Sequence, residues 1–171
     1  LTRVTERVKE LEARGYTFEA ADASFELLLR EEVDGARVSL FDVESWRVIT
    51  EHRPGGGDAV SEATVKLRAA GRRLVATGEG NGPVNALDAA LRKALVPVYP
   101  ELEDMRLVDF KVRIPNGGTG AVTRVLIESG DASGDSWFTV GVSENIVDAS
   151  FEALYDSIIY KLLRSGVKAA A

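Results

Sequence analysis

The chain carries one sequence pattern twice, and this repeat constrains its fold more than any other feature. Gly78 and Ala86 recur as Gly141 and Ala149, at a constant offset of 63 residues. In both copies a run of β-type residues ends at the glycine, and a short loop leads into a helical pattern. Such a duplication predicts a domain with pseudo-twofold symmetry. Two helix N-termini near its axis would form a small anion-binding site, because free N–H groups attract negative charge.

Two helical segments precede the repeat. Apolar residues recur at spacings of three and four within residues 2–14 and again within about 17–32, and Gly15 ends the first run. We therefore predict a helical linker arm over residues 1–35 and assign residues 36–171 to the repeated domain.

Each copy of the repeat predicts three strands followed by one helix. Runs with a period of two indicate strands, and longer runs with a period near 3.6 indicate helices. Because the strand connections are short, we expect antiparallel sheets with helices on one face. The predicted fold is therefore α+β, with two pseudo-twofold-related βββα units after the helical arm. Copy one spans about 37–100, with strands at 37–50, 63–68 and 73–78 and a helix at 83–96; copy two spans about 104–166, with strands at 107–114, 122–128 and 137–141 and a helix at 145–163.

Composition excludes several classes of function. The 171 residues carry a net charge of −6 with scattered basic residues, which argues against a nucleic-acid partner. The chain has no cysteine, which excludes disulfides and fits a cytoplasmic location. No apolar run reaches the roughly 18–20 residues that a membrane helix needs, so no membrane partner is expected. Because the sequence starts at Leu1 without a methionine, we expect a piece of a longer protein.

The glycine-rich segment Gly78–Pro83 joins the third strand of copy one to its helix. It does not match Gly-x-x-x-x-Gly-Lys-Ser/Thr, and Pro83 breaks the pattern Gly-x-Gly-x-x-Gly. One interpretation is a tight turn that needs glycine for a positive φ angle. The other is a loop whose backbone N–H groups meet a ligand carboxylate, since glycine lets a ligand approach the backbone closely.

The sequence shows no catalytic or metal-binding set of residues. His52 is the single histidine, and neither a second histidine nor a cysteine provides a metal-binding partner. Ser143 and Ser150 have no evident base near them, so nucleophilic catalysis is not indicated. Trp46 and Trp137 lie in strand patterns and are interpreted as core or interface residues.

Longer motifs permit a comparison with a known family. The segments Gly80–Leu87 (Gly-Asn-Gly-Pro-Val-Asn-Ala-Leu) and Val140–Ser150 (Val-Gly-Val-Ser-Glu-Asn-Ile-Val-Asp-Ala-Ser) closely resemble the C-terminal regulatory domain of the 2-isopropylmalate synthase and citramalate synthase family. The segments Gly15–Leu28 and Arg106–Val112 look like the citramalate synthase branch. The resemblance covers essentially the whole chain.

This resemblance implies one part of a larger acyltransferase. Family members condense acetyl-CoA with a 2-oxo acid, pyruvate in citramalate synthases, in a TIM barrel that holds a divalent metal through a His-x-His motif and a carboxylate. This chain has one histidine and no barrel, so we expect no metal, no other cofactor and no activity of the chain alone. The family's C-terminal domain forms a homodimer and binds the pathway end product for feedback inhibition. That effector is isoleucine in many citramalate synthases and leucine in isopropylmalate synthases.

By the same resemblance, the effector pocket lies between the two βββα units near the dimer interface. Backbone N–H groups would take the effector carboxylate, an acidic side chain or a carbonyl would take its ammonium, and apolar side chains would enclose the aliphatic group. The matching residues are Gly80, Gly82, Pro83, Val84 and Asn85 of the first loop, Leu107, Phe110 and Ile114 of the first strand of copy two, Ala121 of the next strand, and Ile146 and Asp148 at the second helix start.

One member of this set conflicts with regular strand geometry. Phe110 and Ile114 are an even number of residues apart and share a face, whereas Leu107 falls on the opposite face of a regular strand. We expect Leu107 to reach the pocket only if it precedes the strand or lies at a β-bulge.

Three alternatives stay open from the sequence. The chain could be an enzyme that uses the glycine loop for a phosphorylated or CoA substrate, although a phosphate-binding lysine and a catalytic set are missing. It could be a purely structural dimerisation domain. Within the regulatory interpretation, the effector could be leucine instead of isoleucine, because that choice depends on the shape of the pocket.

Overall fold

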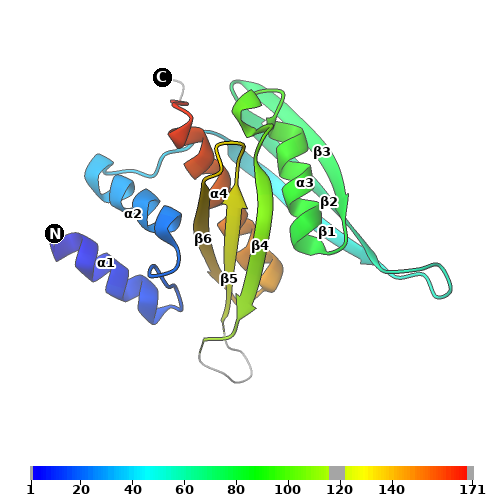
Figure 1. Cartoon of the computed structure of the whole chain (residues 1–171), viewed down its shortest axis with the longest axis horizontal. Helices are drawn as coiled ribbons and strands as arrows, with labels where there is room; N and C mark the ends of the chain where they lie inside the picture. The colour runs from blue at the N-terminus through cyan, green and yellow to red at the C-terminus, as the bar shows by residue number, and fades with distance from the viewer. Residues whose placement is uncertain (1, 116–121, 169–171) are drawn as a thin grey trace. The chain divides into compact units, whose positions relative to one another are not determined.

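The computed structural model describes residues 2–115 and 122–168. The chain divides into two compact units: residues 39–103 form the first-copy unit, and residues 2–38 with 104–164 form the second-copy unit. Each unit holds a three-stranded antiparallel sheet and the helix that follows it (Figure 1). The prediction of an α+β fold with two βββα units and N-terminal helices is confirmed.

The first-copy unit consists of β1 (Asp42–Glu51), β2 (Val60–Ala69), β3 (Arg72–Gly80), α3 (Pro83–Leu95) and a short 3₁₀ helix (Pro100–Leu102). Its sheet has the order β1-β2-β3, and α3 packs on β2 and β3. Every second residue of β2 is buried, which gives this strand the alternation of a half-buried sheet. The fully buried side chains of this unit include Val65, Leu67, Leu87, Leu91 and Leu95.

The second-copy unit repeats this arrangement with β4 (Arg106–Arg113), β5 (Thr123–Gly130), β6 (Ser136–Ser143) and α4 (Ile146–Arg164). The sheet order is β4-β5-β6, and α4 packs on β5 and β6. The fully buried side chains include Ile127, Trp137, Leu154, Ile158 and Leu162. Burial of the Trp137 side chain confirms that it is a core residue.

The arm consists of α1 (Thr2–Ala13) and α2 (Asp22–Asp34), and α2 packs against β6 and α4 (Figure 1). The predicted start of the second helix near residue 17 is wrong. The ring of Phe18 stacks on that of Tyr16 with centroids 6.2 Å apart, so this segment follows an aromatic contact instead of a helix.

The first strand also starts later than predicted, at Asp42 instead of residue 37. Arg37 forms ion pairs with Glu31 and Asp156, which holds it in the second-copy unit. Ser39 donates a hydrogen bond to the Asp42 carboxylate at 3.1 Å, just before the strand begins.

The repeated glycines lie inside strands, so the prediction that each strand ends at its glycine is wrong. An added Cβ on Gly78 would lie 2.4 Å from the Ala90 nitrogen, and one on Gly141 would lie 1.9 Å from the Ala149 oxygen. Neither glycine has a positive φ angle. Glycine is needed because the following helix touches the strand backbone. We call this feature the glycine–alanine contact: Gly78 with Ala86 and Ala90, and Gly141 with Ala149 and Ala153.

Candidate functional site

The start of α3 presents backbone donors without a side-chain cap. Gly82 is the N-cap residue in extended conformation (φ −154°, ψ 175°), and Pro83 follows at the first helical position. The first intrahelical hydrogen bond runs from the Ala86 N–H to the Gly82 carbonyl at 3.1 Å. The N–H groups of Val84 and Asn85 therefore have no intrahelical acceptor and lie at the positive end of the helix dipole. This arrangement suits a carboxylate.

The glycines of this loop serve different purposes. Gly78 lies in the glycine–alanine contact, and an added Cβ on Gly80 would lie 2.7 Å from the Asn85 Cβ, so packing explains both. An added Cβ on Gly82 would meet nothing within 4 Å, and its φ angle suits any residue. The predicted turn with a positive φ angle is therefore wrong. Neither packing nor conformation of the described residues requires glycine at position 82.

The start of α4 has different chemistry. The Asn145 side-chain oxygen accepts hydrogen bonds from the N–H groups of Val147 and Asp148 at 2.9 and 3.1 Å, which confirms Asn145 as the predicted cap. The Ser143 hydroxyl accepts from the Asn145 N–H and donates to the Asp148 carboxylate at 3.2 Å. This helix start thus satisfies donors internally and presents an exposed carboxylate, whereas α3 presents donors.

A β-bulge in β4 resolves the position of Leu107. The register shifts between Leu107 and Asp109, so that Leu107 pairs with Ser129 and Phe110 with Ile127. Ser129 and Ile127 are both buried on the face that packs on α4. Because directly paired residues share a face, Leu107 and Phe110 lie on that same face.

The side chains of β4 on this face are only partly covered. Phe110 is 39% exposed and Ile114, just after the strand, is 59% exposed. Since β4 and β6 both run antiparallel to β5, they end at the same end of the sheet, where Ile146 and Asp148 begin α4. Ile146 is 46% exposed. The second-copy unit therefore brings Ile114, Ile146 and Asp148 to one end of its sheet, and Phe110 lies in the middle of β4 on the same face as Ile114.

The other predicted residues lie elsewhere. Gly80–Asn85 belong to the first-copy unit, a different compact unit from the one that holds the predicted residues of β4 and α4. Ala121 lies outside the described residues.

Comparison with known proteins bears on this site. Residues 19–162 match the family model described as the LeuA allosteric (dimerisation) domain. The chain belongs to this family. It is 61% identical over 170 residues to an (R)-citramalate synthase of Streptomyces coelicolor, covering 98% of this chain and 32% of that protein. It is 52% identical over 164 residues to an (R)-citramalate synthase of Geobacter sulfurreducens (95% and 31%), and 31% identical over 164 residues to a 2-isopropylmalate synthase of Aquifex aeolicus (96% and 29%).

The chain spans about a third of the length of these curated relatives. The resemblance to the synthase family drawn from the sequence motifs is confirmed, and the citramalate synthases are more similar to the chain than the 2-isopropylmalate synthase is.

Sequence reasoning missed the counterpart of Phe110 in the first copy of this LeuA-type domain. The register of β1 shifts between Val43 and Ser45, and Trp46 pairs with the buried Val65 as Phe110 pairs with Ile127. Trp46 is half-buried on the face that packs on α3. Its offset from Phe110 is 64 residues, so a search at the constant offset of 63 does not find it. A better signal is an aromatic residue at the fifth position of the first strand in each copy.

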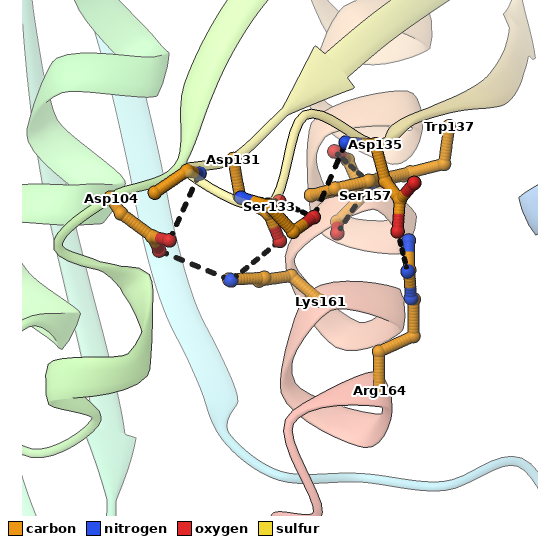
Figure 2. Close-up of polar contacts among 9 residues, drawn as sticks. Asp104, Asp131, Ser133, Asp135, Trp137, Ser157, Lys161 and Arg164 are labelled. Carbon is orange, nitrogen blue, oxygen red and sulfur yellow. Dashed lines mark hydrogen bonds and ion pairs between the residues drawn. The ribbon is translucent and has the colours of Figure 1, made fainter.

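A polar network ties the β5–β6 turn to α4 (Figure 2). The Lys161 ammonium lies 2.8 Å from the Asp131 carboxylate and 3.1 Å from that of Asp104. The side chains of Lys161 and Asp131 are almost completely buried.

Hydrogen bonds from Lys161 and from Ser133 lower the pKa of Asp131 to about 2. Burial lowers the pKa of Lys161, but its two carboxylate partners outweigh that effect and raise it. All these groups satisfy one another, so the network is structural.

The low pKa of Asp131 predicts a stability change in acid. A carboxyl group whose pKa is lowered on folding stabilises the folded state above its unfolded value of 3.8, and this contribution disappears as pH falls towards 2. We expect the difference in unfolding free energy between wild type and Asp131→Asn to be constant above about pH 5 and to shrink between pH 4 and 2. Urea unfolding of both proteins across this range measures it. A difference in unfolding free energy that stays constant down to pH 2 would contradict the lowered pKa of Asp131.

Residues 2–115 and 122–168 contain no group of three or more histidine, cysteine or carboxylate side chains that could hold a metal ion. Among the same residues, no helix combines the length and apolar character needed to cross a membrane.

Proposed function

We propose that this chain is the allosteric and dimerisation domain of a citramalate synthase and that isoleucine is its feedback inhibitor. The whole enzyme would be a cytoplasmic homodimer that condenses acetyl-CoA with pyruvate in a separate, metal-dependent domain. Similarity to proteins named (R)-citramalate synthase, at 61% and 52% identity against 31% for a 2-isopropylmalate synthase, supports this branch.

The difference between the two helix starts carries the proposal of an amino-acid effector. The start of α3 offers uncapped N–H donors at Val84 and Asn85, next to the unobstructed Gly82. The start of α4 offers the exposed Asp148 carboxylate. An α-amino acid carries one carboxylate and one ammonium, which match these two chemistries. The N–H groups at the α3 start therefore suit a carboxylate, and Asp148 at the α4 start suits an ammonium.

The partly covered face of β4 supplies the apolar part of the proposed site. Leu107, Phe110 and Ile114 share one face because of the bulge, and Phe110 and Ile114 are exposed on it. Burying an aliphatic side chain there would contribute roughly 1.5–3 kcal/mol. A branched aliphatic group is thus the effector side chain that this wall favours.

Isothermal titration of the chain with isoleucine, leucine and valine tests the proposal. We expect saturable binding that prefers isoleucine, and at least tenfold weaker binding by Phe110→Ala, because part of the apolar wall is removed. Val75→Ala is the matched control, since Val75 is 53% exposed on a strand of the other sheet, and its replacement should leave affinity unchanged.

Other outcomes separate the alternatives. A preference for leucine would assign the parent enzyme to the 2-isopropylmalate synthases. No binding of any of the three amino acids, combined with a stable dimer in sedimentation, would leave a purely structural dimerisation domain. Equal affinity of wild type and Phe110→Ala would remove β4 from the site.

A further inference from the structure

Polar contacts, buried or partly buried, hold the arm on the second-copy unit. The Tyr16 hydroxyl donates a hydrogen bond to the Glu152 carboxylate at 2.5 Å, and the Ser24 hydroxyl lies 3.1 Å from an Asp156 oxygen. Arg37 forms an ion pair with the other Asp156 oxygen. These five residues, three from residues 2–38 and two from α4, are called the latch below.

The N-terminus of α2 also occupies the free edge of β6. The Asp22 carboxylate accepts a hydrogen bond from the Phe138 N–H at 2.9 Å, and the Ser24 hydroxyl accepts one from the Val140 N–H at 3.0 Å. Unpaired N–H groups on an edge strand need such partners. Ser24 therefore connects the edge of β6 to Asp156.

Apolar packing of α1 on the rest of the second-copy unit is sparse, whereas α2 buries Ala23, Leu27 and Leu28. In α1, Leu11 is the buried residue. A cavity of about 140 Å³ remains where α1, α2, α4 and β6 meet, and charged side chains such as Arg7 and Arg14 line it beside Leu28 and Val140. The latch contacts border this cavity and add to the apolar packing of α2 in holding the arm.

The two α4 carboxylates have a substantial cost of burial. Removal from water raises the pKa of both Glu152 and Asp156, although Tyr16, Ser24 and Arg37 act in the opposite direction. If the arm detached, water would replace those donors. Desolvation of the two carboxylates offsets much of what their partners contribute, so these polar contacts add little net stability to the docked arm.

The first copy has no equivalent of the latch. At the offset of 63 residues, Glu152 corresponds to Ala89 and Asp156 to Lys93. The first-copy unit nevertheless has the same βββα arrangement. The two carboxylates are therefore not needed to build a βββα unit, and their use is specific to the arm.

The latch lies on the helix that begins at the proposed effector site. Asp148, Glu152 and Asp156 are spaced four residues apart in α4 and so line one face of that helix. We propose that the latch is releasable and that an effector at the start of α4 closes it. The effector ammonium would offset the Asp148 charge and reduce repulsion along this row of carboxylates. This coupling rests on the proposed function; the latch itself does not.

Hydrogen–deuterium exchange of the chain tests the latch without any ligand. Asp156→Asn removes the charge that pairs with Arg37, and we expect at least tenfold faster exchange over residues 22–34, with β5 and the C-terminal half of α4 still protected. Asp88→Asn is the matched control, because Asp88 is also a buried helical carboxylate that pairs with arginine, Arg92, at 2.7 Å. Unchanged exchange of residues 22–34 in Asp156→Asn would overturn the latch.

The same measurement with saturating isoleucine tests the coupling. In wild type we expect exchange over residues 22–34 to slow about twofold, as relief of one like-charge pair at this spacing allows. In Asp156→Asn the change should vanish while titration still shows isoleucine binding. Bound isoleucine without slower exchange in wild type would overturn the coupling and leave the proposed function standing. Absence of isoleucine binding would overturn both the coupling and the proposed function.

Discussion

Replacing Lys161 with methionine should lower the free energy of unfolding by about 3–5 kcal/mol. The ammonium neutralises Asp131 and Asp104, and Asp131 is almost completely buried. Methionine retains the apolar stem but leaves a buried carboxylate without its cationic partner, and that uncompensated charge is the main cost. Urea unfolding at pH 7, followed by circular dichroism, measures the loss.

A matched control lies one turn further along α4. Arg164 pairs with Asp135 at 2.6 Å, but the Asp135 side chain is 59% exposed. An exposed pair contributes only about 0–1 kcal/mol, and the contacts of the guanidinium with the Trp137 and Tyr160 rings add about 0.5–1 kcal/mol each, so Arg164→Gln should cost less than Lys161→Met. Equal losses for the two variants would mean that burial of the charge pair is not what stabilises this turn.

Gly141→Ala should cost about 3 kcal/mol, the upper end of the range for overpacking. The new methyl group would lie 1.9 Å from the Ala149 oxygen, so the helix backbone must move away from the sheet. A flexible side chain could yield to such a contact, but a helix backbone cannot. We expect Gly78→Ala to behave similarly, since its Cβ would lie 2.4 Å from the Ala90 nitrogen. The change in the midpoint of thermal or urea unfolding measures both.

Gly82→Ala provides the contrast within the same chain. Its methyl group would meet nothing within 4 Å, so the unfolding free energy should fall only by the roughly 0.5–1 kcal/mol that separates glycine from alanine at an N-cap position. Any larger effect of this variant should appear in isoleucine titration instead. Comparable destabilisation by Gly82→Ala and Gly141→Ala would show that helix contact is not the reason for glycine at position 141.

The repeat made the order of elements predictable. Strands and helices follow from local periodicity, and the Asn145 cap and Pro83 helix start follow from residue types with strong positional preferences. These signals lie within a few residues of the feature that they predict. The predicted strand β4 and helix α4 therefore differ from the observed ones by only one residue or so at each end.

Other features depend on contacts between distant segments and could not be read from the sequence. The role of Gly141 depends on how closely α4 crosses β6, and the face of Leu107 depends on a bulge that changes its pairing partner. The start of α2 depends on the edge of β6, because Asp22 binds the Phe138 N–H. A spacing of four among Asp148, Glu152 and Asp156 was visible, but nothing local indicated what those carboxylates would contact.

The glycine–alanine contact has a mechanical consequence for α4. Backbone touches backbone between Gly141 and residues Ala149 and Ala153, so the helix cannot slide along the sheet without a collision. Any displacement of α4 would therefore have to be a tilt of the helix about this contact, which would act as a fulcrum. Ile146 lies before the fulcrum and Asp156 beyond it. A push on one end of the helix would therefore displace the other end in the opposite direction, as in a rigid lever.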